Sequence, residues 1–286
     1  MFDLNKKEKP FTSFSGFGGG GLGLSGGVTK QLTYVDDVFS TFLYEGNGGS
    51  KPINNNIDLA GEGGMVWIKC RNADTGLSVV HDSERSSINN RLSTNLNNAQ
   101  YTAGSYFTSL DSDGFTLNTS GTAYNSSSND YVSWTFRKAP GFFDVVTYTG
   151  NGSVRQIAHS LGSKPGMIIT KSQDNNHNWG VYHQSMGATK QGYFNAPNSF
   201  GTATSWWNNT EPTSTVFTLG TEAQNNSNGI NYVAYIFAHN DAQFGTDGDE
   251  SIIKCGTYTG NGGTNEINLG FEAQWLIIKD LSLIHI

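Results

Sequence analysis

The sequence predicts an all-β chain built from tandem antiparallel β-sandwiches. Short runs of β-branched and aromatic residues, such as 131–136 and 145–148, are bounded by Gly, Asn or Pro, which is the pattern of strands. Turn dipeptides such as Asn228-Gly229 recur between these runs. We find no segment with the 3.6-residue period of an amphipathic helix of three turns. Many short strands joined by frequent turns favour a sandwich.

A five-residue motif, Tyr-x-Gly-Asn-Gly, occurs three times, at 44–48, 148–152 and 258–262. The spacings are 104 residues (148 − 44) and 110 residues (258 − 148), and such near-constant spacing indicates a structural repeat. An apolar run that ends in lysine follows each motif, at 65–69, 167–171 and 275–279. Because Asn-Gly supplies the positive φ of a tight turn, the motif requires no ligand to explain it.

Matched positions in the repeats predict matched places in the fold. The strand pattern aligns Trp67 with Ile169, and Trp134 with Tyr235, and we expect all four side chains to point inward. Trp275 lies in the third apolar run, so it is also expected to be a core residue.

The repeats divide the chain into consecutive parts. Residues 1–30 are rich in Gly and Ser and predict a flexible arm, because such a composition cannot bury a core. We expect the first sandwich at 31–140 and the second at 141–249. A truncated third repeat is expected at 250–280. Its two strands would form a hairpin that is marginal in water and leaves its apolar run exposed.

The last six residues, 281–286, read Leu-Ser-Leu-Ile-His-Ile. This string matches the translation of a transposase end sequence used as a sequencing adapter, and it falls where the third repeat is interrupted. We therefore expect these residues to be an artefact and the natural protein to continue past Asp280.

The composition narrows the classes of partner. The chain has 286 residues, a formal net charge of −7 and only 14% charged residues. This acidic balance provides no basic surface for nucleic acid, and no stretch approaches the ~20 apolar residues of a membrane helix. We therefore expect neither nucleic-acid binding nor membrane insertion. Cys70 and Cys255 occupy different positions of the repeat, which favours two free thiols over a disulfide.

A histidine and a serine two residues apart recur in both repeats, as His81/Ser83 and His183/Ser185. A catalytic triad also needs an acid that orients the histidine. Asp82 is available beside the first pair, but the second pair has glutamine in its place. The pattern therefore favours structural histidines, and we predict that the chain is not an enzyme.

The aromatic residues suggest a carbohydrate site. Aromatic faces stack on sugar rings, and Asn side chains bind their hydroxyl groups. The candidate residues are Trp206, Trp207, Asn208, Asn209, Tyr106 and Phe107. On this hypothesis, Trp207→Ala weakens binding and leaves the melting temperature nearly unchanged. The alternative is that one tryptophan packs in the core and the other caps the sandwich.

Two acidic clusters suggest calcium as the one cofactor to consider. Asp247, Asp249 and Glu250 form the first cluster, and Asp111 and Asp113 form the second. Calcium prefers such carboxylate oxygens, although the same spacings also occur in ordinary turns. The chain shows no Cys/His spacing typical of zinc sites.

The second repeat carries the clearest family resemblance. The stretches 139–152 and 159–169, together with 251–258, resemble repeats in structural and tail-fibre-like proteins of marine tailed bacteriophages. The pattern is also similar to laminin-G and concanavalin-A-like jelly-roll sandwiches. The resemblance covers about residues 31–280. It implies a virion component made in the cytoplasm of a bacterial host, with other virion proteins and further copies of itself as partners.

We therefore expect a non-enzymatic virion protein that binds host surface polysaccharide through its repeated sandwiches, weakly at each site and more strongly by repetition. The alternative is a purely structural spacer or decoration domain. A polysaccharide-cleaving enzyme ranks last, because such an enzyme needs a pair of well-placed carboxylates, and acidic residues rarely recur at matching repeat positions.

Overall fold

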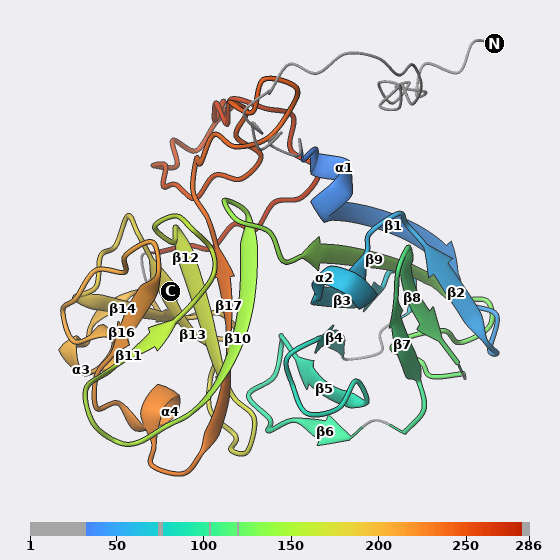
Figure 1. Cartoon of the computed structure of the whole chain (residues 1–286), viewed down its shortest axis with the longest axis horizontal. Helices are drawn as coiled ribbons and strands as arrows, with labels where there is room; N and C mark the ends of the chain where they lie inside the picture. The colour runs from blue at the N-terminus through green and yellow to red at the C-terminus, as the bar shows by residue number, and fades with distance from the viewer. Residues whose placement is uncertain (1–32, 74–76, 103, 119, 282–286) are drawn as a thin grey trace, which may run out of the picture. The chain divides into compact units, whose positions relative to one another are not determined.

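The larger elements of the protein are all β-strands (Figure 1). The computed structural model describes residues 33–73, 77–102, 104–118 and 120–281, and these form a single compact unit. The expected arm at 1–30 and residues 282–286 of the expected adapter segment lie outside the described residues. The helices of the described part are single turns: α1 (Val35–Val38), α2 (Leu59–Glu62), α3 (Thr204–Trp207) and α4 (Ala223–Asn226).

Two six-stranded antiparallel sheets of the same strand order dominate the described residues. The first has the order β1-β9-β3-β4-β5-β6 and consists of β1 (Phe39–Glu45), β9 (Asp130–Arg137), β3 (Gly64–Cys70), β4 (Ser78–Asp82), β5 (Asn90–Ser93) and β6 (Tyr101–Thr102). The second has the order β10-β17-β12-β13-β14-β15 and consists of β10 (Phe143–Thr149), β17 (Asn231–Phe237), β12 (Met167–Ser172), β13 (Gly180–His183), β14 (Lys190–Tyr193) and β15 (Gly201–Thr202). In each large sheet, the strand that comes last in the chain lies between two earlier ones: β9 lies between β1 and β3, and β17 lies between β10 and β12.

A smaller antiparallel sheet accompanies each large one. The first small sheet consists of β2 (Lys51–Asn54), β8 (Gly114–Leu117) and β7 (Phe107–Asp111). The second consists of β11 (Arg155–Ala158) and β16 (Val216–Leu219). We call residues 39–137 lobe 1 and residues 143–237 lobe 2. Both lobes have the two-sheet, antiparallel architecture that the sequence predicts.

Each lobe has its own core between its large and small sheets. In lobe 1, Val66 and Ile68 of β3 meet Phe115 of β8, and all three are fully buried. In lobe 2, Ile168 of β12 and Phe217 of β16 belong to the corresponding core. Successive side chains of a strand point to opposite faces. The residues between these core positions therefore point away from the small sheet.

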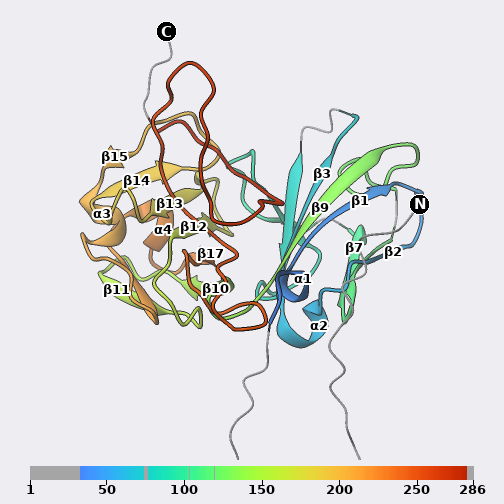
Figure 2. The same cartoon turned by 90° about the horizontal axis from the view of Figure 1, so that it is seen from above.

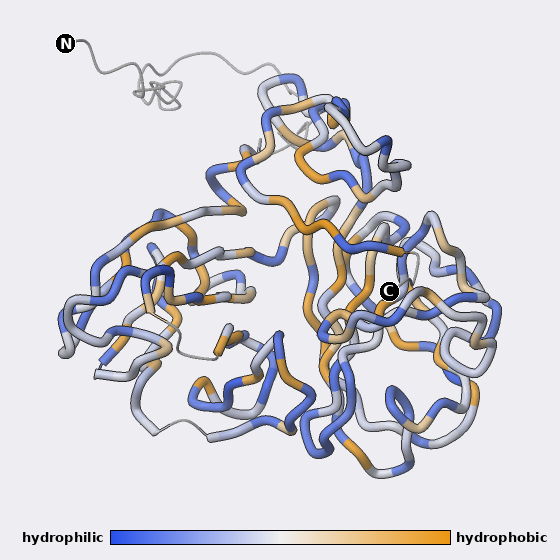
Figure 3. The backbone as a smooth tube through the Cα atoms, turned by 180° about the vertical axis from the view of Figure 1, so that it is seen from behind, coloured by the Kyte–Doolittle hydropathy of each residue, from blue (hydrophilic) through white to orange (hydrophobic). Residues whose placement is uncertain are grey.

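Those alternate residues form a third core, shared by the two lobes. Met65 of β3 and Phe136 of β9 belong to it, as do Val233 and Phe237 of β17. The rings of Phe136 and Phe237 meet edge to face at 5.7 Å between centroids. Figure 2 shows the two large sheets side by side, and the side chains of the shared core come from both of them. Figure 3 shows hydrophobic stretches, in orange, along the central strands. Each large sheet is thus buried on both faces.

The matched positions predicted from the sequence share one register. Trp67 lies opposite Trp134 in the β3–β9 ladder, and Ile169 lies opposite Tyr235 in the β12–β17 ladder. All four side chains pack with the shared core, and not inside their own sandwich. The two pairs therefore occupy corresponding rungs of the two ladders, and their side chains point toward the other lobe.

Polar contacts also join the lobes. The Asp82 carboxylate, which is 2% exposed, forms a 2.7 Å ion pair with Arg85 and accepts a 2.7 Å hydrogen bond from the hydroxyl of Tyr235 in lobe 2. The indole N–H of Trp179 in lobe 2 donates to the backbone carbonyl of Leu96 at 2.9 Å. Burial opposes ionisation of Asp82, but Arg85 and Tyr235 outweigh it and lower the pKa of this carboxyl. The ion pair is thus held between the lobes.

The segment 250–281 lacks the two strands expected there. None of residues 251–281 is in a strand, and Phe244 and Glu250 form an isolated bridge. Leu276 and Ile278 are 62% and 68% exposed, as predicted for the apolar run. The reason is that a strand needs neighbours for its backbone hydrogen bonds, and no further strand of a sheet lies beside this segment in the described residues. Trp275 packs on the shared core without belonging to a strand.

Lys171 of β12 faces lobe 1 with no exposed surface. Its ammonium donates to the backbone carbonyls of Ser172 at 2.8 Å and Asn175 at 3.2 Å. Burial, and secondarily the charge of Arg85, lower the pKa of Lys171 to about 7. An unfolded lysine has a pKa of about 10.4, so between these values the unfolded chain binds a proton that the folded chain does not.

We predict that the protein becomes more stable as the pH rises from 7 to 9, relative to the Lys171→Met variant. The free energy of unfolding of the wild type should gain about 1–2 kcal/mol over this range, because the uncompensated charge is removed from the folded state. Urea denaturation of both proteins at several pH values measures this difference. Parallel pH profiles for the two proteins would show that Lys171 keeps its proton in the folded chain, so that its pKa is not lowered by folding.

Candidate interaction site

The two tryptophans of the predicted carbohydrate site lie in the core. Trp206 and Trp207 of α3 are 2% and 1% exposed, so neither indole can stack on a sugar. Trp207 meets the ring of Tyr182 edge to face at 5.8 Å, and a Cβ on Gly180 would lie 2.0 Å from the Trp206 ring. The expectation that these rings form a surface platform is therefore wrong, because one helical turn directs both of them into the lobe 2 core.

The other predicted carbohydrate ligands do not gather into one site. Asn208 and Asn209 are exposed and adopt left-handed backbone angles, with φ of 52° and 51°, as the chain leaves α3. Tyr106 and Phe107 belong to lobe 1. Phe107 is fully buried and stacks on His81, and the half-buried Tyr106 stacks on Tyr124. Tyr106 and Phe107 were candidates at the corresponding place of the first repeat, and the structure assigns both rings to packing.

We predict that Trp207→Ala destabilises the protein strongly, in contrast to the expectation from a surface site. Removing a fully buried indole should cost about 3–5 kcal/mol. Tyr101→Ala is the matched control, because its ring is 61% exposed and its loss should cost less than about 1 kcal/mol. Thermal and urea unfolding of both variants measures this. If Trp207→Ala were as stable as the control, the Trp207 side chain could not be buried in the core.

The predicted metal ligands surround a turn. Asp247, Asp249 and Glu250 are all exposed, and the backbone of Glu250 pairs with that of Phe244. Among the described residues, no group of three or more His, Cys, Asp or Glu side chains is arranged to hold a metal ion. Calcium binding by the acidic residues stays a prediction.

The paired histidines are built into the fold. In lobe 1, both ring nitrogens of His81 are hydrogen-bonded, Nδ1 to the carbonyl of Ile88 at 2.7 Å and Nε2 to the hydroxyl of Tyr124 at 3.0 Å. Burial lowers the pKa of His81 to about 3, so the ring stays neutral. Ser83 instead accepts from the backbone N–H of Gly64. The prediction of a structural histidine is confirmed for His81.

The Tyr-x-Gly-Asn-Gly motif proves to be an intramolecular binding site in both lobes. Its partner is a turn that we name the Asn–Ser turn, residues 122–126 in lobe 1 and 223–227 in lobe 2, which leads into the central strand of each large sheet. In lobe 1, the Tyr44 hydroxyl donates to the carbonyl of Tyr124 at 2.7 Å, and the Tyr44 ring stacks on Tyr131 at 5.1 Å. In lobe 2, Tyr148 stacks on Tyr232 in the same way at 5.2 Å.

A buried asparagine fixes the motif in each lobe. The Asn125 amide oxygen accepts from the backbone N–H of Asn47 at 2.9 Å, and its carbonyl accepts from Gly48 at 2.8 Å. Asn226 makes the corresponding pair of bonds to Asn151 and Gly152, at 3.1 and 2.7 Å. Both asparagines are fully buried.

The spacing of these partners was present in the sequence and was missed. Asn125 and Asn226 are each followed by serine and then, six residues after the asparagine, by the stacking tyrosine (131 − 125 and 232 − 226). Comparing the residues that precede the repeated strands would have found this signal.

The first glycine of the motif is required by a close approach. A Cβ on Gly46 would lie 2.1 Å from the carbonyl oxygen of Ser126, and one on Gly150 would lie 2.2 Å from that of Ser227. The third copy differs, because nothing lies within 4 Å of the Cβ position of Gly260. Tyr258 is also 49% exposed. The third motif therefore has the residues of the site without its partner.

We predict that the same substitution has a large effect in one copy of the motif and almost none in another. Gly150→Ala should lower the free energy of unfolding by about 1–3 kcal/mol, because the methyl group would overlap a backbone carbonyl. Gly260→Ala should change it by less than about 0.5 kcal/mol, since no atom is near. Urea denaturation compares the two variants, and equal losses would show that Gly260 is also packed in the folded chain.

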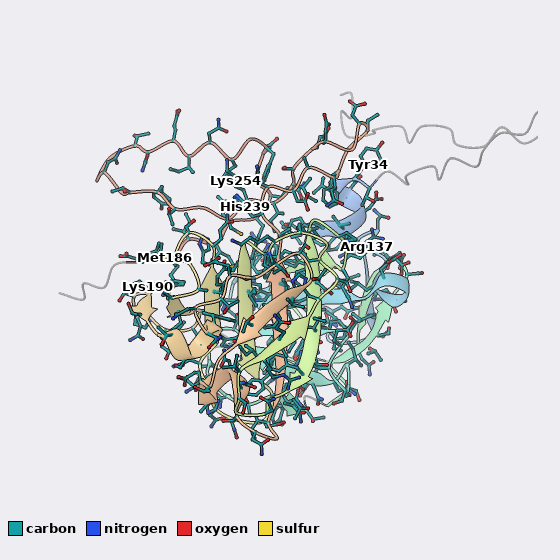
Figure 4. All side chains as sticks on the ribbon, turned by 60° about the vertical axis from the view of Figure 1, so that its left-hand side comes forward. Tyr34, Arg137, Met186, Lys190, His239 and Lys254 are labelled. Atoms are coloured by element: carbon teal, nitrogen blue, oxygen red, sulfur yellow. The ribbon has the colours of Figure 1, made fainter. Side chains whose placement is uncertain are left out.

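The third motif borders a recess of about 970 Å³ between the segment 250–281 and both lobes. Its lining includes the rings of Phe39, Phe136, Phe142, Phe194, Phe200, Phe237, Phe271 and Trp275. Cys255 donates its backbone N–H to the ring of His239 at 3.0 Å and accepts from the Gln184 side chain at 2.9 Å. Figure 4 shows His239 and Lys254 at this junction between lobe 2 and the segment.

The geometry defines a class of all-β protein in which two antiparallel sandwiches share a core, with an irregular segment beside them. The chain belongs to the family of the domain of unknown function DUF7483, whose profile matches residues 35–285 and thus spans both lobes and the segment. No curated protein and no solved structure matches the chain. In the described part of the chain, no helix is long and apolar enough to cross a membrane.

Proposed function

We propose that the chain is a non-catalytic structural component of a bacteriophage virion, in which the two lobes act as one rigid spacer or decoration unit. The observation that carries this proposal is the shared core, with its buried Asp82–Tyr235 contact, which couples the lobes. A spacer needs a fixed relation between successive domains, whereas separate adhesion domains on a flexible linker do not.

The resemblance to tail-fibre-like repeats of marine bacteriophages supports the virion assignment. On this proposal, the protein is made in the bacterial cytoplasm and lies on the particle surface or tail, in contact with other virion proteins and with further copies of itself. The likeness to jelly-roll sandwiches of the laminin-G and concanavalin-A type belongs to the same proposal.

Adhesion to host polysaccharide ranks below the structural role. The aromatic rings on which it depended are packed inside the lobes, with Phe107 and Trp207 both nearly inaccessible. Asn208 and Asn209 are exposed, but the adjacent indoles of Trp206 and Trp207 are buried.

The structural role is tested on purified particles of a phage that encodes this chain. We expect mass spectrometry to find the protein in the particles, and antibodies against the recombinant chain to label the tail or surface in electron micrographs. A protein confined to the lysate, and missing from the particles, would contradict the proposal.

A glycan array separates the structural role from adhesion. We expect the wild type to show no glycan binding that depends on Asn208 and Asn209. The double variant Asn208→Ala/Asn209→Ala should therefore give the same array signal as the wild type. Glycan binding that disappears in this variant would restore adhesion as the leading function.

A further inference from the structure

Each large sheet begins at an edge strand of seven residues, β1 in lobe 1 and β10 in lobe 2 (Figure 1). Gly46, which continues the ladder of β1 and β9, donates its backbone N–H to the carbonyl of Asn129 at 2.8 Å. In an antiparallel ladder, alternate residues bond the partner strand. The even-numbered residues of β1 therefore bond β9, and the backbone groups of Thr41, Leu43 and Glu45 face away from it.

The outer edge of β10 is closed by side chains of lobe 2 itself. The same alternation holds there, so the backbone groups of Val145 and Thr149 face away from β17. The N–H of Val145 donates to the carboxylate of Asp144 at 2.9 Å, and the carbonyl of Thr149 accepts from Arg155 at 2.6 Å. Charged side chains at an edge are one way in which proteins prevent a strand from pairing with another chain.

The corresponding edge of β1 lacks both contacts. A spacing of 104 residues places Ser40 and Lys51 at the positions of the two charged side chains of lobe 2 (144 − 40 and 155 − 51). In the described chain, no residue bonds the outward backbone groups of Thr41, Leu43 and Glu45. The Leu43 side chain is 58% exposed, where lobe 2 has threonine. β1 is therefore an open strand edge with an exposed apolar side chain in the middle of its open groups.

The other edges of the described sheets are short or interrupted. β6 and β15 have two residues each, and β11 and β16 have four. β2 contains Pro52, which has no N–H, and β7 has an irregular register between Phe107 and Ser109. Such features also protect edges. A second copy of this chain that pairs with β1 therefore does so through its own β1.

We propose that β1 is the contact strand of a homodimer, in which it pairs antiparallel with β1 of a second copy. Pairing centred on Leu43 places the two Leu43 residues opposite each other and Thr41 opposite Glu45, so that all the outward backbone groups of these residues are bonded. Phe42 then lies opposite Tyr44, and aromatic cross-strand pairs stabilise a sheet. Glu45, the one charged residue of the strand, does not meet its own copy.

This contact uses the same strand on both chains, so it is isologous and closes at two copies. A single strand pair is a small interface, and we expect a weak dimer with a dissociation constant of about 10–100 µM. The dimer goes beyond the proposed virion role, which would stand without it, because the role is tested on particles and the dimer on the purified chain.

Sedimentation equilibrium of the full chain, from about 1 µM to about 300 µM, tests the dimer. We expect the average mass to rise from that of one chain toward that of two. Leu43→Lys should weaken self-association at least about tenfold, because it places two like charges opposite each other in the ladder. Leu276→Lys is the matched control, since this leucine is 62% exposed outside β1, and it should dimerise within about twofold of the wild type.

Hydrogen exchange at low and high protein concentration locates the contact. We expect the amides of Thr41, Leu43 and Glu45 to gain protection in the dimer, because their N–H groups then bond the second copy. The amides of Ser40 and Phe42 should not change, since they bond β9 in the monomer already. Circular dichroism of both lysine variants checks that they are folded.

Four outcomes would overturn the proposal. They are a chain that stays monomeric over the whole concentration range, a Leu43→Lys variant that dimerises like the wild type, and equal weakening by Leu276→Lys, which would assign association to the apolar run at 275–279. The fourth is protection of Thr41 and Leu43 in the monomer, which would show that another part of the same chain covers this edge.

Discussion

The central strands β9 and β17 each contribute side chains to two cores: the core of their own lobe and the core that the lobes share. The packing of both lobes depends on these two strands. In β17, Tyr232, Ala234 and Ile236 pack within lobe 2, and the residues between them pack against lobe 1. A strand that is buried on both faces reads as a nearly continuous apolar run, which in an antiparallel sheet is less common than alternation. Because both faces are apolar, neither lobe can expose its large sheet to water without losing a substantial part of its buried area.

The polar groups at the lobe junction add specificity to this apolar contact. Asp82 and Arg85 neutralise each other, and Tyr235 completes the hydrogen bonding of the carboxylate across the junction. Removing two charges from water is costly, so such a pair adds little net stability, whereas a misaligned junction would leave a buried charge without its partner. We infer that the apolar surface drives the lobes together and that Asp82 and Tyr235 select their register.

Sequence reasoning predicted the all-β class and its short strands, and it failed where the direction of a side chain decides the outcome. Continuous apolar runs such as that around Trp134 identify a strand, but they cannot say which face meets the small sheet and which meets another lobe. The fusion of the lobes was therefore invisible. Trp206 and Trp207 were misjudged for a related reason. Their polar neighbours Asn208 and Asn209 suggested a surface site, yet the neighbours turn outward through left-handed backbone angles while the indoles turn inward.

Each lobe begins and ends at one rung of its central ladder, since Phe39 lies opposite Phe136 and Phe143 lies opposite Phe237. A tensile force transmitted along the backbone would therefore act across a single rung and peel β1 from β9 one pair at a time, without shearing the whole ladder at once. The bulk of a lobe lies beside the line of tension.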